Sequence, residues 1–400
     1  MSTALQDLLT PADVAAANAL TRRWLVGRDQ LPSAASGLGI WPLLAMLSTG
    51  AVDETRAELL AALGLDADRA AALPRALLDG VRTAPALNVA LGVWAGPGVV
   101  LDPDWAAALP VDAVGSLTGD TTADKAHLDR WAEANTGGLI DAMPIDLDAP
   151  EPIELLLASA LMVRTEWATE FEESTHAPFA SGPWAGLERP RILRATYHDD
   201  VLRCTGDATV LTVRGRDDVD VLLALGADDL APHAVMDTLV DAVDPAWGRS
   251  ATELKPGERA VGVRVSEYTG STPQTGPEIG ATTVAFDATD DLDLTADKGA
   301  LGLVLAADRN KAQFDRLTAK KLYVSQAKQS CTARFSATGF EAAAVTAVGM
   351  AMFGSVPVFE HPRVRHEVAF DRPFAYLAVH RPTGLVLVAG WVAAPALGQD

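Results

Sequence analysis

The sequence predicts one α+β domain, in which helices come early in the chain and strands come late. Helix patterns fill the first quarter of the 400 residues, and short apolar runs that are typical of strands dominate the rest. No internal repeat, low-complexity linker or change in composition marks a domain boundary. With 49% hydrophobic and 21% charged residues, the chain has enough apolar material for one large core.

The helices are predicted from caps and from apolar periodicity. Thr10 followed by Pro11 is typical of a helix start, because a hydroxyl caps free amides and proline fits the first turn. Residues 40–48 are apolar on all sides, which predicts a buried helix. Pro74 is a candidate break within its own stretch. The expected helical stretches are residues 40–48, 53–63, 67–81, 104–109, 124–135 and 233–243.

The strands are predicted from β-branched and apolar runs bounded by turn residues. Residues 153–167 form a long strand candidate, and their centre, residues 155–163, carries no charge. A strand this apolar is expected to be covered on both faces. Residues 381–384, Arg-Pro-Thr-Gly, separate two apolar runs, which is typical of a hairpin turn. The other expected strands are residues 88–94, 209–213, 220–225, 259–267, 282–286, 367–379 and 385–392.

The charge balance limits the classes of partner. Acidic residues number 53 and basic residues 32, which gives a net charge of −21. Phosphate binding needs clustered Lys and Arg, so we expect no nucleic-acid partner. The first residues lack a basic flank and an apolar signal core, and no stretch is long enough to span a membrane. We therefore expect a cytoplasmic product with no membrane partner, and the high Ala, Arg and Gly usage suggests a GC-rich bacterial genome.

A search for catalytic or metal-binding constellations finds none. The HExxH, GxSxG and phosphate-loop patterns are absent, so we expect no enzyme and no cofactor. His361 and His366 form a local cluster, but on a strand they would point to opposite faces, which argues against a metal site. Cys204 and Cys331 have no metal or disulfide spacing, and Cys331, in a predicted strand, is expected to be a buried thiol.

Residues 339–353 stand apart because small side chains dominate them. They read Gly-Phe-Glu-Ala-Ala-Ala-Val-Thr-Ala-Val-Gly-Met-Ala-Met-Phe and carry one charge. Taken alone, the segment is better explained as a buried Ala-rich helix or a strand. Ala favours helix whereas Val and Thr favour strand, so the local preference is divided. A divided preference also suits a segment that adopts two states.

The neighbours of this segment form a series of motifs. Before it, Leu-Tyr-Val-Ser-Gln at residues 322–326 leads into a strand that ends near Ala337. After it comes Phe-Asp-Arg-Pro-Phe at residues 370–374, an F-x-x-P-F signature. The earlier motifs are the apolar helix at residues 45–51 with Glu54-Thr55-Arg56, the pattern W-x-x-x-x-T-x-G-x-I from Trp131 to Ile140, and the strand at residues 157–161 followed by Trp167 and Phe171. This series, which covers nearly the whole chain, resembles the serpin family.

The resemblance implies both a fold and a mechanism. The fold would be one serpin-like domain over residues 1–400, with helices packed around a large central mixed β-sheet and smaller antiparallel sheets. An exposed C-terminal reactive loop would lie at about residues 339–365. Members of the family act on serine proteases, or cysteine proteases, as suicide substrates: the protease cleaves the loop, and the loop then inserts into the central sheet and traps the acyl-enzyme. A monomer is implied, and an extracellular location is also compatible with the family.

The resemblance also implies site residues. Counting forward from Gly339 by the family's hinge length puts the reactive bond between Phe353 and Gly354, with Met352 and Met350 as alternatives. None of residues 342–356 is Arg or Lys, so chymotrypsin-like or subtilisin-like targets with apolar specificity are expected. The implied hinge and insertion residues are Gly339, Phe340, Glu341, Ala342, Ala343, Ala344, Val345 and Thr346. The implied structural switch region is Ser36, Ser159, Trp167 and Gln329.

The sequence departs from the family pattern at several of these positions. Phe340 occupies a hinge position that usually holds a modest residue, and an aromatic that must be buried early would slow insertion. Ala337 stands where the hinge usually carries Glu. Gln329 stands for a usual buried His, Ser159 for a usual Asn, and Gly39 for a serine. Gln and Ser can still hydrogen-bond, so a rewired polar cluster is expected.

Two hypotheses from different functional classes remain, together with a minor third. In an inserted strand Phe340, Ala342 and Ala344 share the inward parity, and small inward residues favour an inhibitor. Phe340 favours the alternative, a non-inhibitory serpin-fold binding protein that is cleaved as a plain substrate. An enzyme of an unrelated class would need a catalytic constellation, and the sequence shows none.

Overall fold

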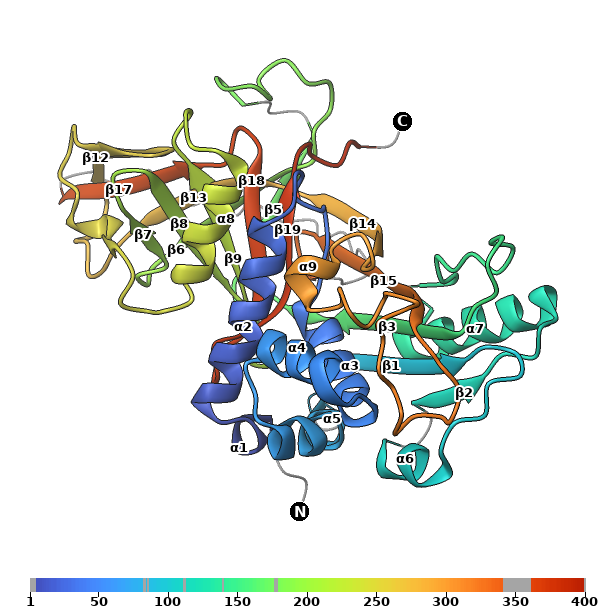
Figure 1. The fold of residues 1–400 in the computed structure, drawn as a ribbon. Helices are drawn as coiled ribbons and strands as arrows, with labels where there is room; N and C mark the ends of the chain where they lie inside the picture. Colours follow the sequence, from blue (N-terminus) through green and yellow to red (C-terminus); the bar gives the residue numbers. More distant parts are fainter. Residues whose placement is uncertain are drawn as a thin grey trace. The chain divides into compact units, whose positions relative to one another are not determined.

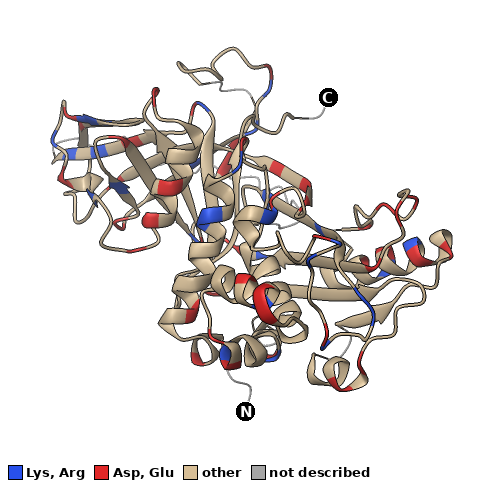
Figure 2. Ribbon diagram, in the orientation of Figure 1, with Lys and Arg blue, Asp and Glu red and all other residues tan. Residues whose placement is uncertain are grey.

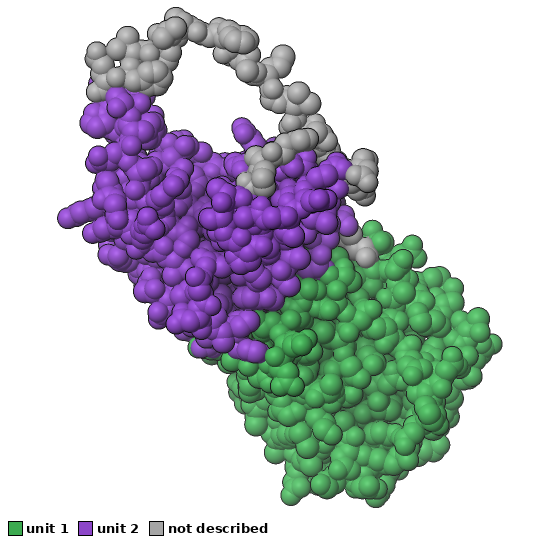
Figure 3. All heavy atoms as spheres, turned by 90° about the horizontal axis from the view of Figure 1, so that it is seen from above, with its two compact units in different colours: residues 1–163, 289–333, 380–389 green, residues 164–288, 334–379, 390–400 purple. Residues whose placement is uncertain are grey.

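The computed structural model describes residues 5–81, 84, 86–110, 113–138, 140–175, 179–340 and 361–398 (Figure 1). Their contacts divide the chain into two compact units, which Figure 3 colours separately. The first unit holds residues 1–163, 289–333 and 380–389, and the second holds residues 164–288, 334–379 and 390–400. That residues 1–400 form one domain stays a prediction.

Helices dominate the first unit. Helix α3 is buried on all sides, as its apolar sequence predicts, and extends beyond the expected residues 40–48. Pro74 was a candidate break, but α5 continues through it, which corrects the expectation. Leu73, Pro74 and Leu77 form one continuous buried face, and its packing compensates for the hydrogen bond that proline cannot donate. The helices of this unit are α1 Leu5–Leu8, α2 Pro11–Val26, α3 Gly37–Gly50, α4 Asp53–Leu63, α5 Ala67–Val81, α6 Pro103–Ala108, α7 Thr121–Thr136 and α9 Lys298–Leu301.

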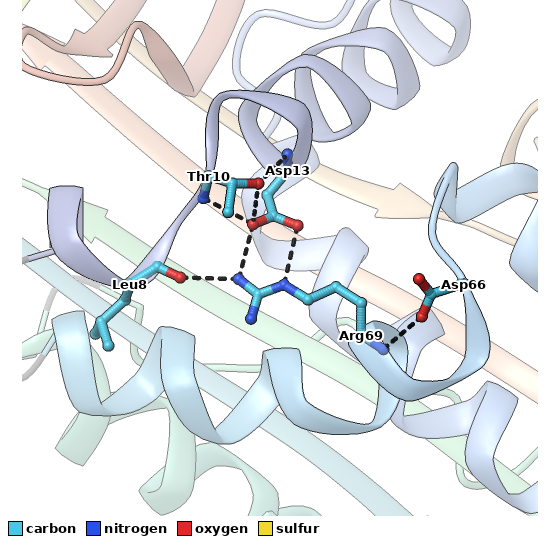
Figure 4. Close-up of polar contacts among 5 residues, drawn as sticks. All are labelled: Leu8, Thr10, Asp13, Asp66 and Arg69. Carbon is cyan, nitrogen blue, oxygen red and sulfur yellow. Dashed lines mark hydrogen bonds and ion pairs between the residues drawn. The ribbon is translucent and has the colours of Figure 1, made fainter.

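A buried ion pair joins the start of α2 to the start of α5 (Figure 4). Arg69 donates from Nε and Nη2 to the two carboxylate oxygens of Asp13, at 3.0 and 2.8 Å, and also from Nη2 to the carbonyl of Leu8. Asp13 in turn accepts from the amide and hydroxyl of Thr10, which caps α2. Burial acts to raise the pKa of Asp13, but the hydrogen bonds from Arg69 and Thr10 outweigh it and lower that pKa.

Arg69→Met is expected to lower the free energy of unfolding by about 3–5 kcal/mol at neutral pH, because it leaves the Asp13 carboxylate buried without its cation. The lowered pKa of Asp13 means that the wild-type advantage is present above the unfolded pKa of about 3.9 and is lost as the pH falls through the folded pKa. Denaturant unfolding of both proteins from pH 7 to pH 3 measures this. Arg69→Lys is the control and should fall between them, since it keeps the charge but not the paired bonds. A wild-type advantage that does not change with pH would contradict the assignment.

The central sheet of the first unit is mixed. Strand β1 (Leu87–Ala95) pairs in parallel with β2 (Val114–Ser116) and antiparallel with β3 (Leu155–Val163). Strand β3 then pairs in parallel with β15 (Val324–Phe335), which also pairs with β14 (Phe286–Asp293). A large mixed sheet is therefore confirmed.

Both faces of β3 are covered by helices, as its uncharged sequence predicts. Leu156, Ala158 and Ala160 belong to one buried cluster with Leu128 and Ala132 of α7. The odd-numbered residues of β3 point to the opposite face, toward α3, since Ser159 Oγ lies against Gly39 of that helix. Alternation along a strand therefore explains why nearly every residue of β3 is buried.

Two further sheets belong to the second unit. One has the order β10-β7-β8-β9-β18, and a hairpin turn after β18 leads into β19. Helix α8 (Pro232–Asp241) packs on β8 and β9. The strands of this sheet in the second unit are β7 Leu202–Cys204, β8 Ala208–Arg214, β9 Val219–Gly226, β10 Arg249–Ser250 and β18 Phe374–His380. Strand β19, Leu385–Val392, begins in the first unit.

The other sheet has the order β11-β12-β17-β13-β6-β5. It was expected to be antiparallel, but β13 and β17 run parallel, so this sheet is mixed. The strand expected at residues 259–267 is split because Gly262, at φ +65°, turns the chain into a hairpin. The strands are β5 Glu172–Ser174, β6 Ile192–Tyr197, β11 Arg259–Ala260, β12 Val263–Gly270, β13 Ile279–Val284 and β17 His361–Ala369.

Two short strands of the second unit come soon after central-sheet strands along the chain. Strand β4 (Thr165–Glu166) comes one residue after β3, and β16 (Gly339–Phe340) comes soon after β15.

Of the described helices, none is long and apolar enough to cross a membrane.

Candidate functional site

Three of the four predicted switch residues meet in the core of the first unit. The side-chain amide of Gln329, on β15, donates from Nε2 to the Ser36 carbonyl at 2.9 Å and to Ser159 Oγ at 3.1 Å, and its Oε1 accepts from the Ser36 amide. Ser36 caps α3 by accepting from the Gly39 amide, and its hydroxyl donates to the carbonyl of Leu387. We call Ser36, Gly39, Ser159 and Gln329 the Gln329 cluster.

The departures from the family pattern fit one another in this cluster. A Cβ atom at position 39 would lie 2.8 Å from Gln329 Nε2 and 3.0 Å from Ser159 Oγ. Glycine at 39 therefore leaves the room that the long Gln329 side chain occupies. The expected rewired polar cluster is present, and its amide group is fully hydrogen-bonded.

Gly39→Ala is expected to destabilise the intact protein by about 1–3 kcal/mol through overpacking, although alanine normally favours a helix. In a Gln329→Ala background the same change should cost less, because the clashing amide is gone. Unfolding of the four proteins of this double-mutant cycle measures the coupling. Equal costs in both backgrounds would show that Gln329 does not explain the glycine.

The fourth predicted switch residue, Trp167, lies in the second unit against the turn between β15 and β16. Its indole Nε1 donates to the Ser336 carbonyl at 2.9 Å, and its amide donates to the Thr338 carbonyl at 3.0 Å. The ring is fully buried, with its centroid 4.8 Å from that of Phe335. We call residues 336–339 the hinge turn; Trp167 holds its backbone from one side.

The hinge turn directs the chain into a strand that is already paired. Phe340 lies opposite Phe335 of β15 and opposite Thr165 of β4, so β16 is bonded on both edges. The Ser336 amide donates to the Gly339 carbonyl at 2.9 Å and closes the turn. The carbonyl of Ala337, where the family usually carries Glu, accepts from the amide of Phe171.

Phe340 is already buried, with 0% of its surface exposed, and its ring centroid lies 6.3 Å from that of Tyr376. The sequence predicted that Phe340 must still be buried during insertion and would slow it. The structure corrects the first of these expectations, because the aromatic ring already occupies a core site.

The remaining predicted hinge and reactive-bond residues lie outside the described residues. They are Glu341, Ala342, Ala343, Ala344, Val345, Thr346, Met350, Met352, Phe353 and Gly354. Along the chain, segment 341–360 connects β16 to β17, which begins at His361.

The other sequence candidates have structural explanations. His366 is buried, with Nε2 3.1 Å from the Leu254 carbonyl oxygen, whereas His361 is half-buried. In the described parts of the chain no group of three His, Cys, Asp or Glu side chains could hold a metal ion. Cys331 is fully buried as predicted, and burial raises the pKa of its thiol to about 12.

Sequence reasoning missed Glu278, a buried carboxylate beside β17. The Tyr268 hydroxyl donates to Glu278 Oε2 at 2.6 Å, and the hydrogen bond to this carboxylate, with burial, raises the pKa of Tyr268. Arg365 Nε lies 3.1 Å from Glu278 Oε1, and Arg363 Nη2 lies 3.5 Å from Oε2. Nothing in the local sequence marks Glu278, since one charge before a strand usually lies in solvent.

Comparison with known proteins decides the family. The family model described as serpin (serine protease inhibitor) matches residues 28–182 and 286–395, which is more than half of the chain. The chain belongs to the serpin family. Serpins generally target proteases, and most of them are inhibitors rather than enzymes.

Relatives and solved structures agree with this assignment. A rice protein (Oryza sativa subsp. japonica) named as a serpin of the Z5 type is 25% identical over 389 residues, which cover 90% of this chain and 84% of the relative. Serpin48 of the insect Tenebrio molitor has a TM-score of 0.68 at 15% identity, with 96% of this chain and 98% of that chain covered. Human thyroxine-binding globulin in complex with its ligand has a TM-score of 0.70 at 19% identity, with 96% and 97% covered. The serpin fold predicted from the sequence is confirmed.

Proposed function

We propose that this serpin is a monomeric suicide inhibitor of serine proteases with apolar specificity. The protease cleaves segment 341–360, and the part before the cut inserts between β3 and β15 before the acyl-enzyme is hydrolysed. The observation that carries the proposal is β16, whose residues already pair with β15 on one edge and with β4 on the other. An extension of β16 would continue to pair along β15 on one edge and along the segment that contains β4 on the other.

The register of β16 defines where each following residue would lie. Phe335 pairs with Phe340, and partner numbers in an antiparallel pair keep a constant sum, here 675. Residue 341 would therefore face Arg334, an exposed cation, which suits Glu341. Residue 342 would face Ala333, which is fully buried and leaves room for a small side chain.

The same register favours the predicted reactive bond. Pairing along the whole of β15, to Val324, needs the inserted strand to reach residue 351. A cut after Phe353 or Met352 leaves enough chain for this, whereas a cut after Met350 leaves it one residue short. Of these two sites the Phe353–Gly354 bond is preferred, because its aromatic side chain suits a protease with an apolar pocket.

Insertion requires the seam between β3 and β15 to open at the Gln329 cluster. Gln329 and Ser159 are register partners across that seam, and their side chains are hydrogen-bonded to each other. The cluster is buried, so its separation without new partners would cost about 1–3 kcal/mol for each polar group left unpaired. We infer that the Gln329 cluster acts as the switch region and keeps the sheet closed until a strand enters.

Incubation with chymotrypsin or subtilisin, followed by a denaturing gel, tests the proposal. We expect a covalent band at the summed mass of serpin and protease, with cleavage mapped by mass spectrometry to the bond after Phe353 or after Met352. Trypsin is the matched control and should give no such band, because segment 341–360 contains no Arg or Lys.

Two outcomes would contradict the proposal at different points. Cleavage without a covalent band would mean that the protein is a substrate, which is the alternative of a non-inhibitory serpin-fold binding protein. An unfolding temperature that does not rise after cleavage would mean that the segment does not insert.

A further inference from the structure

A pocket of about 500 Å³ lies in the second unit, against strand β17. Its volume is in the range of small-molecule sites. The apolar side chains that line it are Leu254, Pro256, Pro277 and Val364. Apart from Val364 and His366, its lining comes from residues 183–285, which the serpin family model does not match. The pocket is therefore built mainly from parts of the chain that lie outside the general family pattern.

His366 is the buried polar side chain that lines this pocket. It is 4% exposed, and its Nε2 lies 3.1 Å from the carbonyl oxygen of Leu254. A carbonyl oxygen only accepts, so Nε2 carries the hydrogen and Nδ1 of the neutral ring presents a lone pair. Nδ1 has no hydrogen-bond partner among the described residues. A buried acceptor without a partner is unfavourable, and a ligand in the pocket can supply the missing donor.

Alternation along β17 separates this acceptor from the basic side chains of the same strand. Val364 and His366 share one face of β17, and both line the pocket. Arg363 and Arg365 point to the opposite face, where both contact Glu278. Strand β17 is one of the strands with basic segments, which Figure 2 shows in blue. The arginines of β17 therefore do not compete with a cationic ligand for the pocket.

Hydrogen bonds hold two walls of the pocket in place. Gln274 donates from Nε2 to the Val364 carbonyl at 2.9 Å and accepts from the Val364 amide at 2.8 Å, so its amide group pairs with β17 as a neighbouring strand would. The Ser250 hydroxyl donates to Asp200 Oδ1 at 2.7 Å and fixes this exposed carboxylate. Walls that are fixed in advance lower the entropic cost of binding.

The charges around the pocket favour a cation at its rim. The exposed charged residues of the lining are Asp200, Glu253 and Lys255, so two carboxylates oppose one ammonium. A cationic group is better placed at this rim than beside His366, because a buried ammonium loses its hydration. A neutral hydroxyl is the cheaper donor for the buried Nδ1 atom.

We propose that this pocket binds a small aromatic amine with a hydroxyl group at the far end of its ring. The hydroxyl donates to Nδ1 of His366, the ring packs against the prolines and Val364, and the ammonium group faces Asp200 and Glu253. This inference is independent of the proposed function, because the pocket and its test involve no protease.

Calorimetric titration of the intact protein with three small molecules tests the proposed chemistry. Tyramine has the hydroxyl, the ring and the ammonium group, and we expect a dissociation constant of about 1 mM or lower. 2-Phenylethylamine lacks only the hydroxyl and should bind about twofold to tenfold more weakly. 3-(4-Hydroxyphenyl)propionate carries a carboxylate in place of the amine and should bind about fivefold or more weakly. In nitrogen NMR spectra the signal of His366 Nδ1 should move with tyramine and stay in place with 2-phenylethylamine.

Three variants place the binding in this pocket. Val364→Phe fills part of the apolar lining and should weaken tyramine binding at least about tenfold. Asp200→Asn should weaken it about twofold to fivefold. Asp199→Asn is the matched control, because Asp199 is the neighbour of Asp200 in the chain but contacts Arg214 and is not among the residues that line the pocket. It should bind as the wild type does.

Several results would overturn the proposal. The first is a titration with tyramine that shows no binding, which would leave the pocket to water. Another is binding of the carboxylate as tight as that of tyramine, which would contradict the charge argument. Wild-type affinity in both Val364→Phe and Asp200→Asn would place the ligand elsewhere. If Val364→Phe does not fold, the comparison of Asp200→Asn with Asp199→Asn decides the question, and equal effects of the two would overturn the site.

Discussion

Replacing Ala342 by arginine is expected to turn the inhibitor into an ordinary substrate of chymotrypsin or subtilisin. In the register set by Phe335 and Phe340, residue 342 would face Ala333, which is 0% exposed. An unpaired guanidinium at this position costs several kcal/mol to bury. If half of a 5 kcal/mol cost is felt in the transition state, insertion slows by roughly 50-fold or more, and the acyl-enzyme hydrolyses first.

Ala343→Arg is the control for this prediction, because it makes the same change one residue further along the chain. Residue 343 would face Thr332 on the other side of the strand, which is not fully buried. Gel densitometry should show the covalent band retained in Ala343→Arg and lost in Ala342→Arg. Similar bands for the two variants would mean that the inserted strand does not continue the register of β16.

Replacing Phe340 by threonine is expected to lower the free energy of unfolding of the intact protein by about 3–5 kcal/mol. The strand that carries the ring is bonded to β15 and β4, and the ring itself is fully buried near Tyr376, so its loss leaves a cavity. The fraction of protease trapped should nevertheless stay unchanged. Phe340 occupies the same core site before and after insertion, so the cost cancels between the two states.

Thermal unfolding of the intact protein and the trapped fraction on a gel measure these two effects separately. Phe340→Leu is a graded control and should lose less stability, since leucine fills more of the site than threonine. An unchanged unfolding temperature together with a larger trapped fraction would show that the ring is a barrier to insertion after all.

Much of the helical and central-sheet framework could be predicted because its signals are local. Glycine after Leu63 ends α4 in the left-handed conformation, at φ +67°, and the uncharged run in β3 indicates two covered faces. The serpin motifs were recognisable for the same reason, because each one depends on residues close together in the chain.

The parts that could not be predicted depend on contacts between distant segments. Glu278 and β12 meet β17 about a hundred residues later in the chain, and no local pattern reports such a pairing. The burial of Phe340 depends on β4, which lies far earlier in the sequence. Gly39 and Gln329 were noticed separately as departures from the family, and only the fold shows that one makes room for the other.

The Gln329 cluster has a consequence for the kinetics of this serpin. In the register of β16, residue 346 would face Gln329, and residue 346 is the threonine of segment 342–348. When a strand separates Gln329 from Ser159, the Thr346 hydroxyl can accept the hydrogen bond that Ser159 Oγ accepts now. The starting and final states then hold the same number of hydrogen bonds at Gln329. The hydrogen bonds of Gln329 therefore contribute to the height of the barrier and not to the free-energy difference between the two forms, so changes at Gln329 should alter how fast the trap closes and not how stable the closed trap is.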